Sequence, residues 1–175
     1  MPAPAKRLVS GAVTLLPLSA EHAADYIALA NEPSIAPRVN NPIPFTQANF
    51  DKLLADMQAM DYGYYIWMIA HEGQIVGCIN NSDMLNAGRY QGGYWISPQA
   101  RGKGIARTAL TLVKDFLFAE AGAVRVQALI EPDNPASQRV VEACGYTREG
   151  LLRRFYPSKT HGLIDVYMYA IVRSE

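Results

Sequence analysis

Two glycines between a strand pattern and a helix pattern most constrain what this chain can fold into. Gly102 and Gly104 follow a β-rich run over 89–97 and open a helical pattern that extends from about 102 to 121. A strand that enters a helix this way leaves successive backbone N–H groups without partners at the positive end of the helix dipole. Glycines also let a ligand approach the backbone closely. The sequence therefore predicts an anion-binding loop.

Neighbouring side chains support this interpretation and exclude two known nucleotide loops. Arg101 and Lys103 add positive charge for phosphates that lie outside the amide cradle. A P-loop requires Ser or Thr where Gly104 stands, and the upstream glycine spacing also fails. A dinucleotide fingerprint requires a third glycine at Arg107 within a parallel βαβ unit. The plain alternative is a glycine turn that only starts a helix.

Hydrophobic periodicity predicts the other elements. We expect a strand at 13–18, helices over 19–30 and 46–61, strands at 64–70, 74–81 and 89–97, a helix at about 102–121, a strand at 124–130, a short helix at 134–144, and final strands near 146–155 and 163–172. The Pro-rich stretch 31–44 predicts a surface loop that can form a pocket wall. This order predicts a mixed α/β sandwich, with helices covering a sheet, in one domain spanning residues 1–175.

Charge and cysteine content exclude several classes of function. Sixteen basic and sixteen acidic residues cancel, so no global field gathers nucleic acid or attaches the protein to an anionic membrane. Cys78 and Cys144 give neither a disulfide framework nor metal-ligand spacing. No apolar run approaches the length of a membrane span. We therefore expect a cytoplasmic protein without a metal, a membrane or a nucleic-acid partner.

At the glycine loop the chain resembles a known family. The pattern Gln99-x-x-Gly102-x-Gly104, followed by Ile105-Ala106, resembles motif A of the GNAT superfamily of N-acetyltransferases. Three further segments, 92–98 (GGYWISP), 134–137 (NPAS) and 144–150 (CGYTREG), resemble the branch that contains ribosomal-protein N-terminal alanine acetyltransferases. The likeness covers about residues 64–172, whereas the first 60 residues match only in outline.

The resemblance implies a fold and a cosubstrate. A twisted, mainly antiparallel sheet is flanked by about four helices, and its fourth and fifth strands, 89–97 and 124–131, splay apart. Acetyl-CoA is then the cosubstrate, with its pyrophosphate on the loop amides and its pantetheine arm in the gap. The implied cofactor-binding residues are Ile96, Gln99, Arg101, Gly102, Lys103, Gly104, Ile105, Ala106, Asn134 and Ser137.

Acetyl transfer requires a base for the amine proton and an acid for the leaving thiolate. Related enzymes often carry Glu at the positions of Gln91 and Gln127, and a Tyr acid at the position of Val141. Ser137 resembles the serine that protonates the thiolate in the ribosomal-protein branch, and Glu131 is a nearby carboxylate. Both are candidate catalytic residues, although Ser137 also fits a serine that bonds only to backbone, and Glu131 also fits a solvated charge.

The absence of a carboxylate at position 91, where related enzymes often carry Glu, helps to predict the class of acceptor. Deprotonation at pH 7 costs about 1 kcal/mol for an α-amine of pKa near 7.8 and about 4.6 kcal/mol for a lysine-like amine of pKa near 10.4. We therefore expect the α-amine of a peptide or protein N-terminus, or of an amino-acid-like molecule. Arg38, Asn40 and Tyr94 are the candidate acceptor-binding residues. An acetyltransferase for polyamines or aminoglycosides is the alternative enzyme.

Two non-enzymatic interpretations stay open at this point. The residues Gln91, Gln127 and Val141 also fit a regulatory domain that binds acyl-CoA without turnover. A third interpretation is an interaction protein that uses exposed aromatic residues, for which Tyr62, Tyr64, Tyr65 and Tyr90 are candidates. Homodimers are common in the resembling family, but the sequence identifies no interface.

Overall fold

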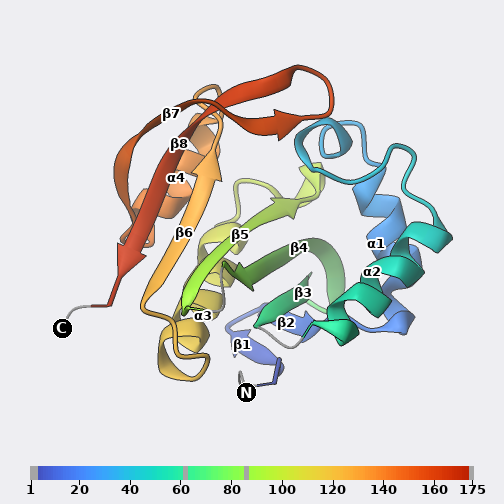
Figure 1. Cartoon of the computed structure of the whole chain (residues 1–175). Helices are drawn as coiled ribbons and strands as arrows, with labels where there is room; N and C mark the ends of the chain where they lie inside the picture. The colour runs from blue at the N-terminus through green and yellow to red at the C-terminus, as the bar shows by residue number, and fades with distance from the viewer. Residues whose placement is uncertain (1–3, 61–62, 85–86, 174–175) are drawn as a thin grey trace.

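The computed structural model describes residues 4–60, 63–84 and 87–173. The strands are β1 (Leu8–Ser10), β2 (Val13–Pro17), β3 (Tyr64–His71), β4 (Gln74–Asp83), β5 (Arg89–Ile96), β6 (Arg125–Ile130), β7 (Thr147–Ser158) and β8 (Gly162–Val172), and the α-helices are α1 (Ala23–Ala30), α2 (Gln47–Ala59), α3 (Ile105–Ala119) and α4 (Pro135–Ala143). The strands form a single sheet in the order β1-β2-β3-β4-β5-β6-β8-β7 (Figure 1). Among the described residues, β5 and β6 form the only parallel pair. The predicted mixed, mainly antiparallel fold with four helices is confirmed.

Helices cover both faces of the sheet, so its central strands are buried on both sides. Trp67 of β3 belongs to the core that packs against α3, together with Phe116 of that helix. Met68, the next residue, belongs to a second core with Phe50 of α2 and Tyr26 of α1. Successive side chains of a strand point to opposite faces. The continuous apolar run of β3 therefore reflects burial on both faces rather than a one-sided sheet.

The sheet opens between β5 and β6. These strands pair only at three positions, from Arg89 opposite Arg125 to Gln91 opposite Gln127. Beyond Gln91, β5 pairs with β4 alone, and beyond Gln127, β6 pairs with β8 alone. Two strand edges with backbone groups free of ladder bonds therefore face one another across a widening gap. This gap is the splay that the family resemblance implies.

Several boundaries differ from the sequence prediction for local reasons. α3 begins at Ile105 because Gly102 and Gly104 have φ values of 77° and 76°, which a right-handed helix excludes. β1 was missed because three residues carry too little periodicity to predict a strand. α2 ends at Ala59, whereas the predicted end at Asp61 lies outside the described residues.

The aromatic residues proposed for interaction are mostly core residues. Tyr65 and Tyr90 are 3% and 1% exposed, and both belong to the core beneath α3. Tyr64 is half-buried, and Tyr62 lies outside the described residues. Among the helices that the structure describes, none has the length and apolar character needed to cross a membrane.

Candidate active site

The glycine loop lies at the open end of the splay. β5 ends at Ile96, a short 3-10 turn follows at Pro98–Ala100, and Gly104 is the N-cap of α3. The first intrahelical backbone bond runs from the Thr108 N–H to the Gly104 carbonyl at 3.1 Å. The amides before Thr108 therefore lack helical acceptors at the positive end of a 15-residue helix. Gln99, Gly102 and Lys103 are exposed in this loop, so the predicted anion cradle is accessible.

Arg101 joins the glycine loop to two other segments through hydrogen bonds. Its Nε donates to the Ile96 carbonyl at 3.0 Å, and its Nη2 donates to Ser34 Oγ at 2.8 Å. Ser34 lies in the predicted Pro-rich loop, so this contact joins that loop to the anion cradle. No feature of the sequence predicted Ser34 as a partner. Lys103, by contrast, makes no ion pair within the described residues, which leaves its ammonium group available to an anion.

Two residues predicted for separate roles meet across the splay. The Tyr94 hydroxyl of β5 and the Ser137 Oγ of α4 lie 3.1 Å apart. Burial raises the pKa of Tyr94, and the hydrogen bond with Ser137 partly offsets that rise. Asn134 accepts a bond from the Ser137 N–H at 3.1 Å and so caps α4. The cap holds Ser137 in the first turn of the helix, where its hydroxyl reaches Tyr94.

A polar chain lies where the splay begins. Gln127 Nε2 donates to Gln91 Oε1 at 2.9 Å, and Arg125 Nε donates to Gln127 Oε1 at 2.7 Å. Arg125 also donates through Nη1 to Glu149 at 2.8 Å. The pKa of Glu149 is lowered, chiefly by this hydrogen bonding. The alternation of Arg125 and Gln127 on one face of a predicted strand was the available sequence signal, but the pairing with Gln91 depends on strand register.

The predicted acceptor residues are only partly brought together. Arg38 Nη1 lies 3.2 Å from Glu131 Oε2 and 3.7 Å from Asp133 Oδ1. Burial raises the pKa of Glu131, while the positive charge of Arg38 opposes that rise. Glu131 also interacts electrostatically with Tyr156 and His161 of the β7–β8 hairpin. Asn40 is exposed, and in the described part of the chain it makes no hydrogen bond to this cluster.

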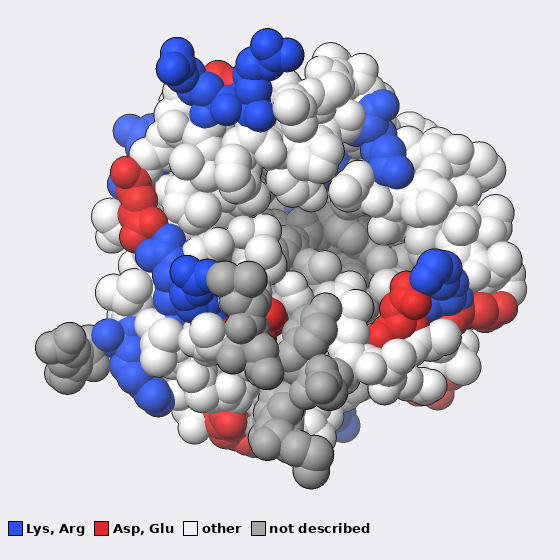
Figure 2. Space-filling view, in the orientation of Figure 1, with Lys and Arg blue, Asp and Glu red and all other residues white. Residues whose placement is uncertain are grey.

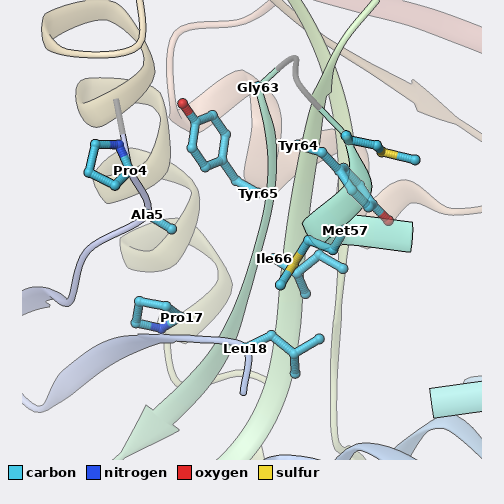
Figure 3. A pocket seen from close by; sticks show the side chains of 10 residues that line it. Pro4, Ala5, Pro17, Leu18, Met57, Gly63, Tyr64, Tyr65 and Ile66 are labelled. Carbon is cyan, nitrogen blue, oxygen red and sulfur yellow. The ribbon is translucent and has the colours of Figure 1, made fainter. Parts of the chain in front are cut away.

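One face of the molecule is hollowed. Figure 2 shows the hollow between the β7–β8 hairpin and the side of the molecule where α1 and α2 lie. A different pocket, of about 240 Å³, is lined by residues of the N-terminal segment, β2, α2 and β3, including Pro4, Leu18 and Met57 (Figure 3). None of the predicted site residues lines it. The described residues also hold no cluster of His, Cys, Asp and Glu that suits a metal ion.

Comparison with known proteins gives a consistent family. Residues 12–147 match the family described as "Acetyltransferase (GNAT) domain". The "Uncharacterized N-acetyltransferase p20" of Bacillus licheniformis is 31% identical over 110 residues, which are 62% of this chain and 61% of that protein. The "Putative ribosomal N-acetyltransferase YdaF" of Bacillus subtilis (strain 168) is 28% identical over 124 residues, 69% of this chain and 63% of the relative. The chain thus spans less than two thirds of the length of these relatives.

Solved structures share the fold over nearly the whole chain. RimJ of Mycobacterium smegmatis, in complex with CoA-disulfide, has a TM-score of 0.81 and 23% identity, covering 95% of this chain and 86% of that one. The ribosomal-protein-S5-alanine acetyltransferase of Vibrio fischeri has a TM-score of 0.82 and 17% identity, covering 98% of each chain. A chimera of spermidine N-acetyltransferase from Vibrio cholerae and hSSAT has a TM-score of 0.78 and 18% identity, covering 93% and 96%.

Proposed function

Because the chain belongs to the GNAT acetyltransferase domain family, we propose that it transfers an acetyl group from acetyl-CoA to a primary amine. The acceptor is the α-amine of a peptide or protein N-terminus, or of an amino-acid-like molecule. The observation that carries the proposal is the splay between β5 and β6, with an accessible glycine loop at its open end. No metal or second cofactor takes part.

The splay has the dimensions that an acetyl-CoA arm requires. The loop amides of Gly102–Ala106 and the Lys103 ammonium bind the pyrophosphate at the open end. Ile96 lies five residues beyond Gln91, the last paired position, and at about 3.3 Å per residue this part of β5 spans roughly 17 Å. An extended pantetheine arm bridges a comparable distance. Its amides bond the free edge of β5, and Asn134 holds it from α4.

Ser137 and Tyr94 supply the proton for the leaving group. The amine nitrogen bonds to the acetyl carbon, and the carbon–sulfur bond then breaks to release a thiolate. Ser137 Oγ–H protonates the sulfur, and Tyr94 O–H returns a proton to Ser137 across their 3.1 Å contact. Solvent reprotonates the Tyr94 oxygen. Related enzymes often have a tyrosine acid at the position of Val141 in α4, and Val141 is a core residue here. The Tyr94–Ser137 pair takes the place of that acid.

Glu131 receives the amine proton through a chain of water molecules, because it lies four residues beyond Gln127, a distance of roughly 13 Å along β6. Its pKa is raised by burial, which makes the carboxylate a stronger base than an exposed one, and Arg38 holds it at the mouth of the splay. An α-amine of pKa near 7.8 needs only this modest assistance at neutral pH. Arg38 and Asn40 contribute the rim of the acceptor site. Loss of a proton from Glu131 and from the amine both favour the reaction, so kcat/KM is expected to rise with pH up to about pH 8, near the amine pKa.

Release of free CoA thiol from acetyl-CoA tests the proposal against a panel of N-terminal peptides, amino-acid amides, polyamines and aminoglycosides. Calorimetry with acetyl-CoA runs in parallel. Turnover restricted to α-amines is the expected result. Turnover restricted to polyamines or aminoglycosides would overturn the acceptor class. Binding without turnover across the panel would support a regulatory acyl-CoA-binding domain, and absence of binding would overturn the assignment of the glycine loop.

A further inference from the structure

The hydrogen-bonded chain of Glu149, Arg125, Gln127 and Gln91 has a fixed direction. Arginine carries only donors, so the atom of Gln127 that lies 2.7 Å from Arg125 Nε is its carbonyl oxygen. Gln127 must then present its NH₂ group to Gln91, whose carbonyl oxygen accepts at 2.9 Å. Amide orientation is ordinarily ambiguous because oxygen and nitrogen look alike. Here Arg125 removes the ambiguity, and the far end of the chain is the Gln91 NH₂ group.

That NH₂ group is available to a ligand. Within the part of the chain that the structure describes, Gln91 Nε2 has no hydrogen-bond partner, although the residue is half-buried. Gln91 neighbours Tyr90, whose side chain lies in the core beneath α3. Since neighbouring strand residues point to opposite faces, Gln91 points to the opposite face from α3. Its position is the last paired one before the strands separate.

We propose that Gln91 determines acceptor specificity by donating from Nε2 to the oxygen atom that adjoins the acceptor amine. This inference rests on the proposed function, because the acetyl carbon reaches the same point of the splay. The matching oxygen is the carbonyl of an amino-acid amide or of the first residue of a peptide. An alkyl polyamine offers only donors, so it leaves the Gln91 N–H groups without an acceptor.

This selectivity follows from the free-energy cost of leaving a half-buried donor without a hydrogen-bond acceptor. A half-buried donor that loses water without gaining an acceptor weakens binding by about tenfold to a hundredfold. Two facing donors, an ammonium and an amide NH₂, also repel electrostatically. A carboxylate at position 91 reverses both effects. The direction of the hydrogen-bonded chain therefore determines which acceptors are favoured, and Arg125 fixes that direction although it does not contact the acceptor.

Two substitutions reverse the donor end by different routes. Gln91→Glu replaces it directly. Gln127→Glu leaves residue 91 unchanged, but the new carboxylate accepts hydrogen bonds from both Arg125 and Gln91. The Gln91 amide group must therefore rotate, and it then presents its carbonyl oxygen to the acceptor. Each variant is compared with wild type in kcat/KM for alaninamide, for sec-butylamine, which lacks the carbonyl, and for spermidine. The change relative to wild type is taken for each acceptor separately, which removes the difference in amine pKa.

Both variants are expected to lose about tenfold or more with alaninamide, and to gain with sec-butylamine and spermidine, which offer only donors. Gln74→Glu, an exposed change of the same charge at the start of β4, is the matched control and keeps the wild-type preference. Equal losses with all three acceptors would overturn the inference, as would a Gln127→Glu variant with wild-type selectivity.

A binding measurement separates this inference from the proposed function. The N-acetylated products of alaninamide and sec-butylamine are titrated into the CoA-loaded protein by calorimetry. A preference for the carbonyl-bearing compound that both variants lose supports the role of Gln91 even in a protein without turnover, and then only the proposed function fails. Absence of that preference in an active wild-type protein overturns the inference alone.

Discussion

Two parts of the candidate site are built in different ways. In the glycine loop, the candidate ligands are backbone amides of a few consecutive residues around Gly102 and Gly104. In the rest of the site, the groups are side chains brought together from distant segments. Arg38 and Glu131 are 93 residues apart in the chain, and Tyr94 and Ser137 are 43 residues apart. The glycine loop depends on local conformation, whereas the side-chain groups depend on tertiary packing.

This difference separates two kinds of sensitivity to mutation. A backbone cradle tolerates changes of side chain but not of φ, whereas a side-chain cluster tolerates local backbone changes but not the loss of a functional group. Substitutions at the glycine loop should therefore affect acetyl-CoA binding, and substitutions of the side-chain groups should affect turnover or acceptor KM. Four predictions, in order of decreasing effect, test this division.

Removal of either hydroxyl of the Tyr94–Ser137 pair should have the largest effect. Ser137→Ala and Tyr94→Phe are each expected to lower kcat by about a hundredfold, because general acid catalysis contributes at least that much. Because the two residues act as one relay, the double variant should be little worse than either single variant. Steady-state kinetics and acetyl-CoA calorimetry measure the effect, and affinity should stay within about threefold.

Tyr146→Phe is the matched control for Tyr94→Phe. The Tyr146 hydroxyl is buried and has no hydrogen-bond partner in the described structure. Its removal should leave kcat unchanged and should not lower stability, because a buried hydroxyl without a partner is unfavourable. A Tyr94→Phe variant with the kcat of Tyr146→Phe would exclude Tyr94 from the relay.

Gly104→Val should weaken acetyl-CoA binding by about tenfold to a hundredfold with little effect on acceptor KM. Gly104 has a φ of 76°, where an L residue costs about 1–2 kcal/mol and β-branching adds strain. The cradle must therefore distort, although no atom lies within 4 Å of an added Cβ. Gly150→Val is the control, since its site is equally open and its φ is not positive. Equal affinities of the two variants would contradict the role of the loop.

Arg38→Ala should raise acceptor KM by up to about fivefold, since the Arg38 side chain is 47% exposed and surface ion pairs contribute at most about 1 kcal/mol. Arg38 also lowers the pKa of Glu131 against the effect of burial. Its removal should therefore move the acidic limb of the kcat/KM profile to higher pH. Lys52→Ala, which breaks a surface pair on α2, serves as the control. An unchanged pH profile would contradict the role of Glu131 as the group that receives the amine proton.

The smallest expected effect is on stability at low pH. Hydrogen bonding from Arg125 lowers the pKa of Glu149 in the folded protein. The contribution of this ion pair to the free energy of unfolding is therefore complete above the unfolded pKa of about 4.3. It is lost as pH falls through the lower, folded pKa. Glu149→Gln should therefore reduce the free energy of unfolding at pH 7 by less than about 1 kcal/mol, and by less still at pH 3.

Urea titrations at both pH values measure this difference. Glu72→Gln, at a residue that makes no ion pair within the described structure, should show no such pH dependence. A Glu149→Gln variant whose destabilisation grew as the pH fell would contradict the ion pair.

The sequence predicted elements well where a pattern repeats within one segment. The run 64–70 and the hairpin to 74–81 were correct because apolar strand residues and a short turn are local signals. β1 was missed, and the length of β7 was underestimated, because strands at or near an edge need few buried residues. The splay itself followed from family resemblance, since no residue pattern states where two strands cease to pair.

The sequence by itself determined the glycine loop, because positive φ and the free amides of a first helical turn depend only on neighbouring residues. It also placed Ser137, Tyr94, Gln91 and Gln127 on their elements. Only the tertiary structure decided that Tyr94 meets Ser137, that Ser34 holds Arg101, and that Arg125 orients Gln91 through Gln127. Hydrogen bonds extend only about 3 Å, so contacts between distant segments are set by strand register and helix packing, which local patterns do not encode.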